Sequence, residues 1–140
     1  MLKTVFVAGS LLILGCNDGH PPVQPTRGQL FINGIAAEGA TVAFHPIGGD
    51  FDKQGICPSA RVTADGSFIL NTYNPQDGVP AGEYADTIVW PLRPDDPESP
   101  DRLNRQYCSV KDSPRHVTIK EGENELEPFR LDKVRMLRQR

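Results

Sequence analysis

Three histidines and three cysteines are the side chains of this 140-residue chain that could supply a nucleophile, a general base or a soft metal ligand. A nucleophile works only beside a base and an orienting group, and a zinc site needs clustered histidine and cysteine ligands. His20 lies in a proline-rich stretch, whereas His45 and His116 fall on outward positions of expected strands. No serine or cysteine stands in a recognisable nucleophile motif. The sequence therefore predicts a protein without catalytic residues, metal or cofactor.

The acidic segment from Pro91 to Asp101 is rich in proline and too polar to be part of a core. We expect a flexible loop. A calcium site is the alternative interpretation, but the acidic residues lack the regular alternate spacing and the turn glycine of the known calcium-binding loop.

Three aromatic residues, Trp90, Tyr73 and Tyr107, are candidates for ligand binding. An aromatic ring has a flat apolar face that can stack on a sugar, although aromatic side chains are more often buried. An exposed row of these rings would favour a glycan-binding protein. Buried rings would favour a structural or protein-interaction module.

The elements that position these residues are expected to be short strands joined by turns, because the chain has thirteen glycines and thirteen prolines. Asp65-Gly66, between the apolar runs of Val62–Leu70, predicts a hairpin with a two-residue turn of positive φ. Asn33-Gly34 is a second candidate for such a turn. Further strands are expected at Gln29–Ile32, Ala40–Pro46, Glu83–Trp90, His116–Lys120 and Leu126–Leu131.

Alternation along these strands predicts which side chains face the core of a single all-β domain. Pro46 closes its strand or keeps it at an edge, and Pro128 marks an edge or a bulge. The residues expected to be largely buried are Phe44, Phe68, Leu70, Ile88, Val117, Ile119, Phe129 and Leu131.

Asp86 conflicts with this pattern, because it falls on the same face as Tyr84, Ile88 and Trp90. An unpaired buried carboxylate is costly. Three explanations stay open: Asp86 has a partner, it sits at the wet margin of the sheet, or the inner face is the opposite one.

The first residues of the chain combine a short basic start, Met1-Leu2-Lys3, with an apolar run from Thr4 to Gly15. This run is too short to span a bilayer comfortably but suits the core of a signal peptide. Its end, Ile13-Leu14-Gly15-Cys16, resembles the bacterial lipoprotein signal, in which cleavage precedes a cysteine that becomes lipidated. Ile13 stands where the motif usually has leucine.

The resulting division of the chain has four parts: a signal peptide (1–15), the lipidated Cys16 with a flexible tether (16–26), a β-sandwich domain (27–132) and a basic C-terminal tail (133–140). The protein is expected to be exported and held by its lipid on the envelope membrane, with the domain on the periplasmic or outer side. If Cys16 carries lipid, two cysteines remain in an oxidising compartment, which allows a disulfide between Cys57 and Cys108. Two unrelated thiols are the alternative.

Three segments carry a resemblance to a known family: Gly28–Pro46 (GQLFINGIAAEGATVAFHP), Thr63–Tyr73 (TADGSFILNTY) and Pro80–Trp90 (PAGEYADTIVW). They resemble the transthyretin-like, carboxypeptidase regulatory-like β-sandwich, in the form found in short lipoproteins of planctomycete bacteria. The resemblance implies about seven strands in two sheets and a non-catalytic accessory module. Asp86, usually valine in that pattern, and Cys108, usually a small residue, depart from it.

The function expected from these observations is that of a non-catalytic, lipid-anchored structural or protein-interaction module of the cell envelope. The alternative is a glycan-binding module. A net charge of −3 gives no electrostatic case for nucleic acid. The expected partners are therefore the membrane, through the lipid on Cys16, and an envelope protein or glycan that the sequence does not identify.

Overall fold

The computed structural model describes residues 19–48 and 55–138. Within these ranges the chain is all-β apart from one 3₁₀ turn at Val110–Asp112. The strands are β1 (Val23–Gln24), β2 (Thr26–Ile32), β3 (Ile35–Ala36), β4 (Thr41–Pro46), β5 (Ser59–Arg61), β6 (Ser67–Ile69), β7 (Val79–Pro80), β8 (Gly82–Val89), β9 (His116–Ile119), β10 (Asn124–Glu125) and β11 (Phe129–Leu131). The predicted all-β sandwich is confirmed, with eleven short strands in the described residues rather than about seven.

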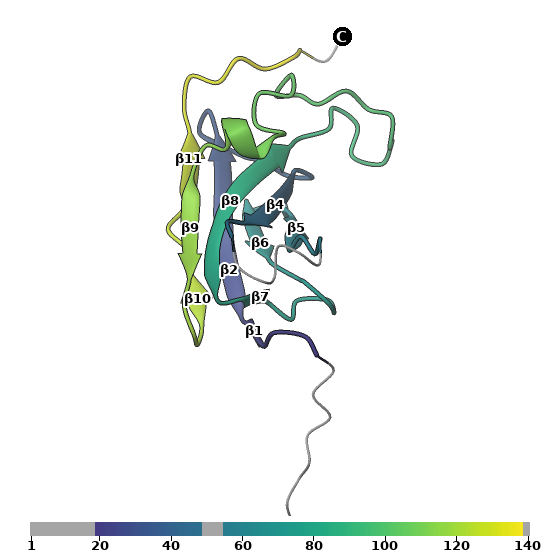
Figure 1. Cartoon of the computed structure of the whole chain (residues 1–140). Coiled ribbons are helices and arrows are strands. Elements are labelled where there is room, and N and C mark those ends of the chain that lie inside the picture. The colour runs from purple at the N-terminus through teal and green to yellow at the C-terminus, as the bar shows by residue number, and fades with distance from the viewer. Residues whose placement is uncertain (1–18, 49–54, 139–140) are drawn as a thin grey trace, which may run out of the picture.

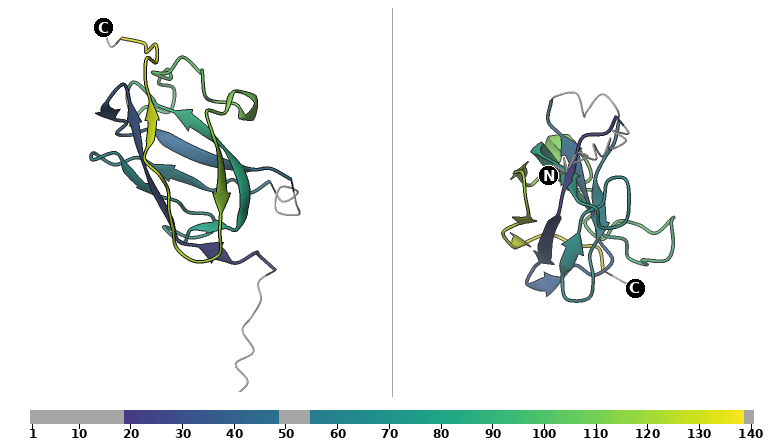
Figure 2. Two further views of the ribbon diagram at one scale, coloured as in Figure 1. Left: turned by 90° about the vertical axis from the view of Figure 1, so that its left-hand side faces the viewer. Right: turned by 90° about the horizontal axis from the view of Figure 1, so that it is seen from below.

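The strands form two principal sheets that face each other (Figures 1 and 2). One has the order β5-β4-β8-β9 and is antiparallel throughout. The other is built around β2, which pairs with β3 and β6 in antiparallel fashion and with β10 and β11 in parallel fashion. A small third pair, β1 with β7, lies at the end of the molecule where the described chain begins (Figure 1).

The core lies between the two sheets and follows the predicted alternation. In β4, Val42 and Phe44 are fully buried, as is Ala40 just before the strand, while the residues between them are exposed or half-buried. Opposing them from the other sheet are Leu30, Ile32, Phe68 and Leu70. Pro46 ends β4, which is an interior strand, so the first of its two predicted roles holds.

The two predicted turns differ in outcome. Asn33 and Gly34 both have positive φ, 51° and 79°, and join β2 to β3, so this two-residue turn is confirmed. At Asp65-Gly66 only Gly66 has a positive φ, so the prediction of a two-residue turn is wrong here. The Asp65 carboxylate instead accepts hydrogen bonds from Thr63 Oγ1 and from the backbone and side chain of Ser67, which close a longer turn.

The arms of this central turn also separate, contrary to the predicted hairpin. β5 pairs with β4 in one sheet, and β6 pairs with β2 in the other. The backbone hydrogen bonds between the arms lie near their ends, where Thr63 N–H donates to Ser67 O and Ser59 bridges to Asn71. The segment therefore forms a corner that connects the two sheets.

The C-terminal strands cross from one sheet to the other. After β9, the chain joins β2 twice in parallel, as β10 and as β11, and the break between them contains Pro128, as a bulge requires. Phe129 and Leu131 share a face, but they are half-buried because β11 lies at the margin of the sheet. Val117 is also partly buried, so these three residues pack against the core without being fully enclosed by it.

Both predicted flexible ends contribute to the fold. Within the predicted tether, Val23 and Gln24 form β1 and Thr26 is buried. Within the predicted basic tail, Val134 is buried and exchanges two hydrogen bonds with the Asn33 side chain. The signal peptide and Cys16 lie outside the described residues, and no helix in the described part is long and apolar enough to cross a bilayer.

Candidate functional site

Among the described residues, Asp86 is the charged residue that is fully buried, with no exposed surface. Its Oδ2 accepts a hydrogen bond of 2.5 Å from Arg115 Nε, so the first of the three predicted explanations is correct. The Arg115 guanidinium also lies 4.2 Å from the ring centre of Phe129 and donates to the Glu127 carbonyl at 3.4 Å. Asp86 is in one sheet and Phe129 in the other. The ion pair therefore links the two sheets at this margin.

The pair is incompletely satisfied. Asp86 Oδ1 and Arg115 Nη2 are both buried and have no hydrogen-bond partner in the structure. Burial disfavours the charged carboxylate more than Arg115 favours it, which raises the pKa of Asp86 to about 6.

This pKa predicts an unusual pH dependence of stability. Between the folded pKa of about 6 and the ordinary value of 3.8, the folded protein binds a proton that the unfolded chain does not bind. Acidification through this window therefore stabilises the fold, by roughly 1 kcal/mol between about pH 7 and pH 5. We expect this gain to be lost in Asp86→Asn, as measured by urea denaturation at both pH values.

Comparing the wild type with Asp86→Asn separates the effect of Asp86 on stability from the effect of a second titrating group, His45. Burial lowers the pKa of His45, so protonation of His45 on acidification acts in the opposite direction. That contribution is the same in the wild type and in Asp86→Asn. Equal pH dependence of the two proteins would contradict the assignment to Asp86.

A thiol and an imidazole, which the sequence did not place together, meet at the end of β4. Cys57 Sγ lies 3.7 Å from His45 Nδ1, and His45 Nε2 forms a 2.8 Å hydrogen bond with Thr87 Oγ1. Desolvation raises the pKa of Cys57 and lowers that of His45, which disfavours the charged thiolate–imidazolium pair. The sequence offered one signal for this pair, the outward position of His45 on its strand. It could not show that the chain returns after a loop and places Cys57 beside β4.

The predicted disulfide between Cys57 and Cys108 is not formed, since both are free thiols. Each contacts a different part of the chain. Cys57 Sγ donates to the Phe44 carbonyl at 3.4 Å, whereas Cys108 Sγ donates to the Arg105 carbonyl at 3.2 Å. The structure agrees with the alternative prediction, in which Cys57 and Cys108 are two unrelated thiols.

The three candidate aromatic residues do not form an exposed row. Trp90 is 3% exposed, donates from Nε1 to the Glu38 carbonyl and is covered by the Arg102 guanidinium. Tyr107 packs against the core, and the Tyr73 hydroxyl is buried. His20 is exposed, and its ring centre lies 4.5 Å from that of Tyr73. A stacking platform of these rings is therefore absent from the described surface.

The acidic segment 91–101 uses its carboxylates to fold its own backbone. Asp101 accepts hydrogen bonds from the N–H groups of Trp90, Leu103 and Arg105, and Arg93 pairs with Asp96. Because these oxygens are engaged, they are poorly placed to ligate a cation. The described residues bring together no cluster of three histidine, cysteine or acidic side chains that could hold a metal.

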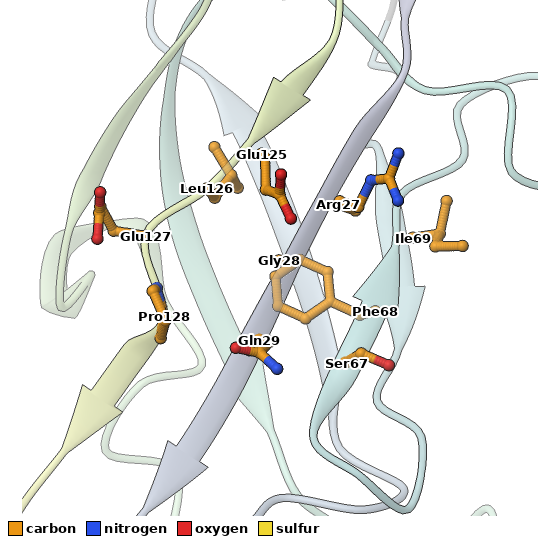
Figure 3. A pocket seen from close by; sticks show the side chains of 10 residues that line it. All are labelled: Arg27, Gly28, Gln29, Ser67, Phe68, Ile69, Glu125, Leu126, Glu127 and Pro128. Carbon is orange, nitrogen blue, oxygen red and sulfur yellow. The ribbon is translucent and has the colours of Figure 1, made fainter.

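A concave pocket of about 610 Å³ lies on the sheet around β2 (Figure 3). Figure 3 shows β2 crossing between β6 on one side and the segment 125–128 on the other. Gly28 is at the centre, and the ring of Phe68 is so close that a Cβ on Gly28 would lie 2.6 Å from it. The bare backbone of Gly28 therefore forms part of the floor. We call this site the Gly28 pocket, lined by Arg27, Gly28, Gln29, Ser67, Phe68, Ile69, Glu125, Leu126, Glu127 and Pro128.

Comparison of the chain with known protein families, with curated proteins and with solved structures found no match.

Proposed function

We propose that the protein is a non-catalytic, lipid-anchored module of the cell envelope, built on a transthyretin-like, carboxypeptidase regulatory-like β-sandwich. The lipoprotein-like sequence ending at Cys16 supports the anchor. The order of the motifs in 27–132 and the two facing sheets support the type of sandwich. The raised pKa of the Cys57 thiol beside a His45 of lowered pKa supports a role without nucleophilic catalysis.

The observation that carries the proposal is the short distance along the chain between Cys16 and the fold. Only residues 17–22 separate Cys16 from β1. Six residues extend over at most about 20 Å, so an acylated Cys16 would hold the sandwich close to the membrane surface. The C-terminal segment lies at the opposite end of the molecule (Figure 1), which leaves that end directed outward for a protein partner.

Cys16→Ser tests the anchor directly. We expect the variant either to remain an unprocessed precursor or to leave the membrane fraction, because two or more acyl chains are needed for stable attachment. Intact mass and detergent partitioning measure both outcomes. Cys57→Ser is the matched control and should stay in the membrane fraction with the mass of the lipidated protein. Unchanged mass and partitioning of Cys16→Ser would contradict the proposal.

A further inference from the structure

We propose that the Gly28 pocket binds a neutral saccharide through hydrogen bonds and aliphatic contacts, without the aromatic stacking that the sequence suggested. This inference goes beyond the proposed function. It assigns a ligand class to a site that a structural module would not require.

The pocket exists because the parallel ladder along β2 is interrupted. β10 pairs with Thr26 and Arg27, and β11 pairs with Leu30 and the two residues after it. Gly28 and Gln29 have no ladder partner on that side, because the chain bends away at 126–128 around Pro128. Gly28 is itself buried, and only its backbone separates the opening from the ring of Phe68. The sequence thus leaves a depression in the middle of a sheet instead of at its rim.

Three polar side chains beside Gly28 are not engaged by any other described residue. Arg27, Gln29 and Glu125 lie around Gly28 (Figure 3), and none has a side-chain hydrogen bond or ion pair with another described residue. Together they offer guanidinium donors, an amide that both donates and accepts, and a carboxylate acceptor. A saccharide hydroxyl both donates and accepts, so neighbouring hydroxyls match this set of groups.

The charges of the pocket favour a neutral ligand. Arg27 and Glu125 are direct partners across the β2–β10 ladder, so their opposite charges largely offset each other at the opening. Glu127, the other charged lining residue, is negative and disfavours anions further. An anionic sugar would therefore gain little from Arg27 and would be repelled by the two glutamates.

Three aliphatic residues of the lining suit the C–H face of a sugar ring. Ile69 is 43% exposed although it is a large apolar residue, and Leu126 and Pro128 flank the opening from the other side. Binding would cover this apolar surface. The pocket volume of about 610 Å³ lies within the range of small-molecule sites and accommodates one or two sugar rings.

The test uses the full-length protein solubilised in detergent, labelled with ¹⁵N and titrated with maltose and with cellobiose to about 20 mM. We expect the amide signals of Arg27, Gly28 and Gln29 to shift with at least one sugar, with a Kd of about 1 mM. Absence of shifts at these amides with both sugars would overturn the proposal. Glucuronate binding more tightly than glucose would overturn the assignment to a neutral ligand.

Two single variants separate binding through the side chains from a nonspecific effect. Gln29→Ala and Glu125→Ala should each weaken binding at least about tenfold, because each removes hydrogen bonds to the ligand. Glu123→Ala is the matched control, since Glu123 is an exposed acid on the neighbouring turn outside the pocket. Unchanged affinity in both pocket variants would refute the site. These results are independent of Cys16 processing, so the anchor and the sugar site fail or succeed separately.

Discussion

Replacing Arg115 with leucine is expected to lower the free energy of unfolding by about 3–5 kcal/mol. The substitution leaves the Asp86 carboxylate buried, with no exposed surface and without its counter-charge. It also removes the guanidinium that lies over Phe129 and connects the two sheets. Urea denaturation at neutral pH measures the loss, and acidification should recover part of it because protonation neutralises Asp86.

Two further variants test whether the buried charge is the cause. Asp86→Val combined with Arg115→Leu should recover most of the lost stability, because a buried pair can often be replaced by apolar residues at little cost. Arg93→Leu should cost less than about 1 kcal/mol, since the Arg93–Asp96 pair is exposed. A loss in Arg115→Leu no larger than that in Arg93→Leu would show that Asp86 does not need its partner.

Gly78→Ala is expected to destabilise the fold by about 3 kcal/mol or more. Gly78 has a φ of 108°, and a Cβ at this position would lie 2.0 Å from the carbonyl oxygen of Gln24. A backbone atom cannot turn aside as a side chain can, so β1 would have to separate from β7. Thermal unfolding measures the loss, and amide exchange at Val23 and Gln24 should become faster.

Gly122→Ala is the control for this prediction. Gly122 also has a positive φ, 96°, but a Cβ there would meet no atom within 4 Å. Its substitution should therefore cost only the backbone strain, about 1–2 kcal/mol. Equal losses in the two alanine variants would show that close approach to Gln24 contributes nothing.

Local sequence patterns predicted much of the fold. Alternation identified Phe44 as a core residue of β4, and Asn33-Gly34 identified a turn whose two residues need positive φ. Both signals depend on neighbouring residues alone. The conflict at Asp86 was equally visible, because a carboxylate among apolar residues on one face needs a partner.

Pairing over long sequence distances could not be predicted in the same way. Nothing local decides that the arms beside Asp65-Gly66 join different sheets, or that β10 and β11 run parallel to β2. Arg115 is 29 residues from Asp86, and several arginines were equally available as its partner. For the same reason the Gly28 pocket could not be predicted from the sequence, since Gln29 and Glu125 come from opposite ends of the domain.

The attachment of β1 to β7 has a mechanical consequence. A pulling force on the N-terminal end reaches the domain first at this pair, which joins only two residues on each strand. The next strand, β2, is hydrogen-bonded along both edges and is therefore much harder to extract. Tension would open β1 before it disturbs the sandwich, and the freed residues 23–25 would add about 10 Å of extension. If Cys16 carries the proposed lipid, the domain has a short extensible link at the point where a moving membrane would pull on it.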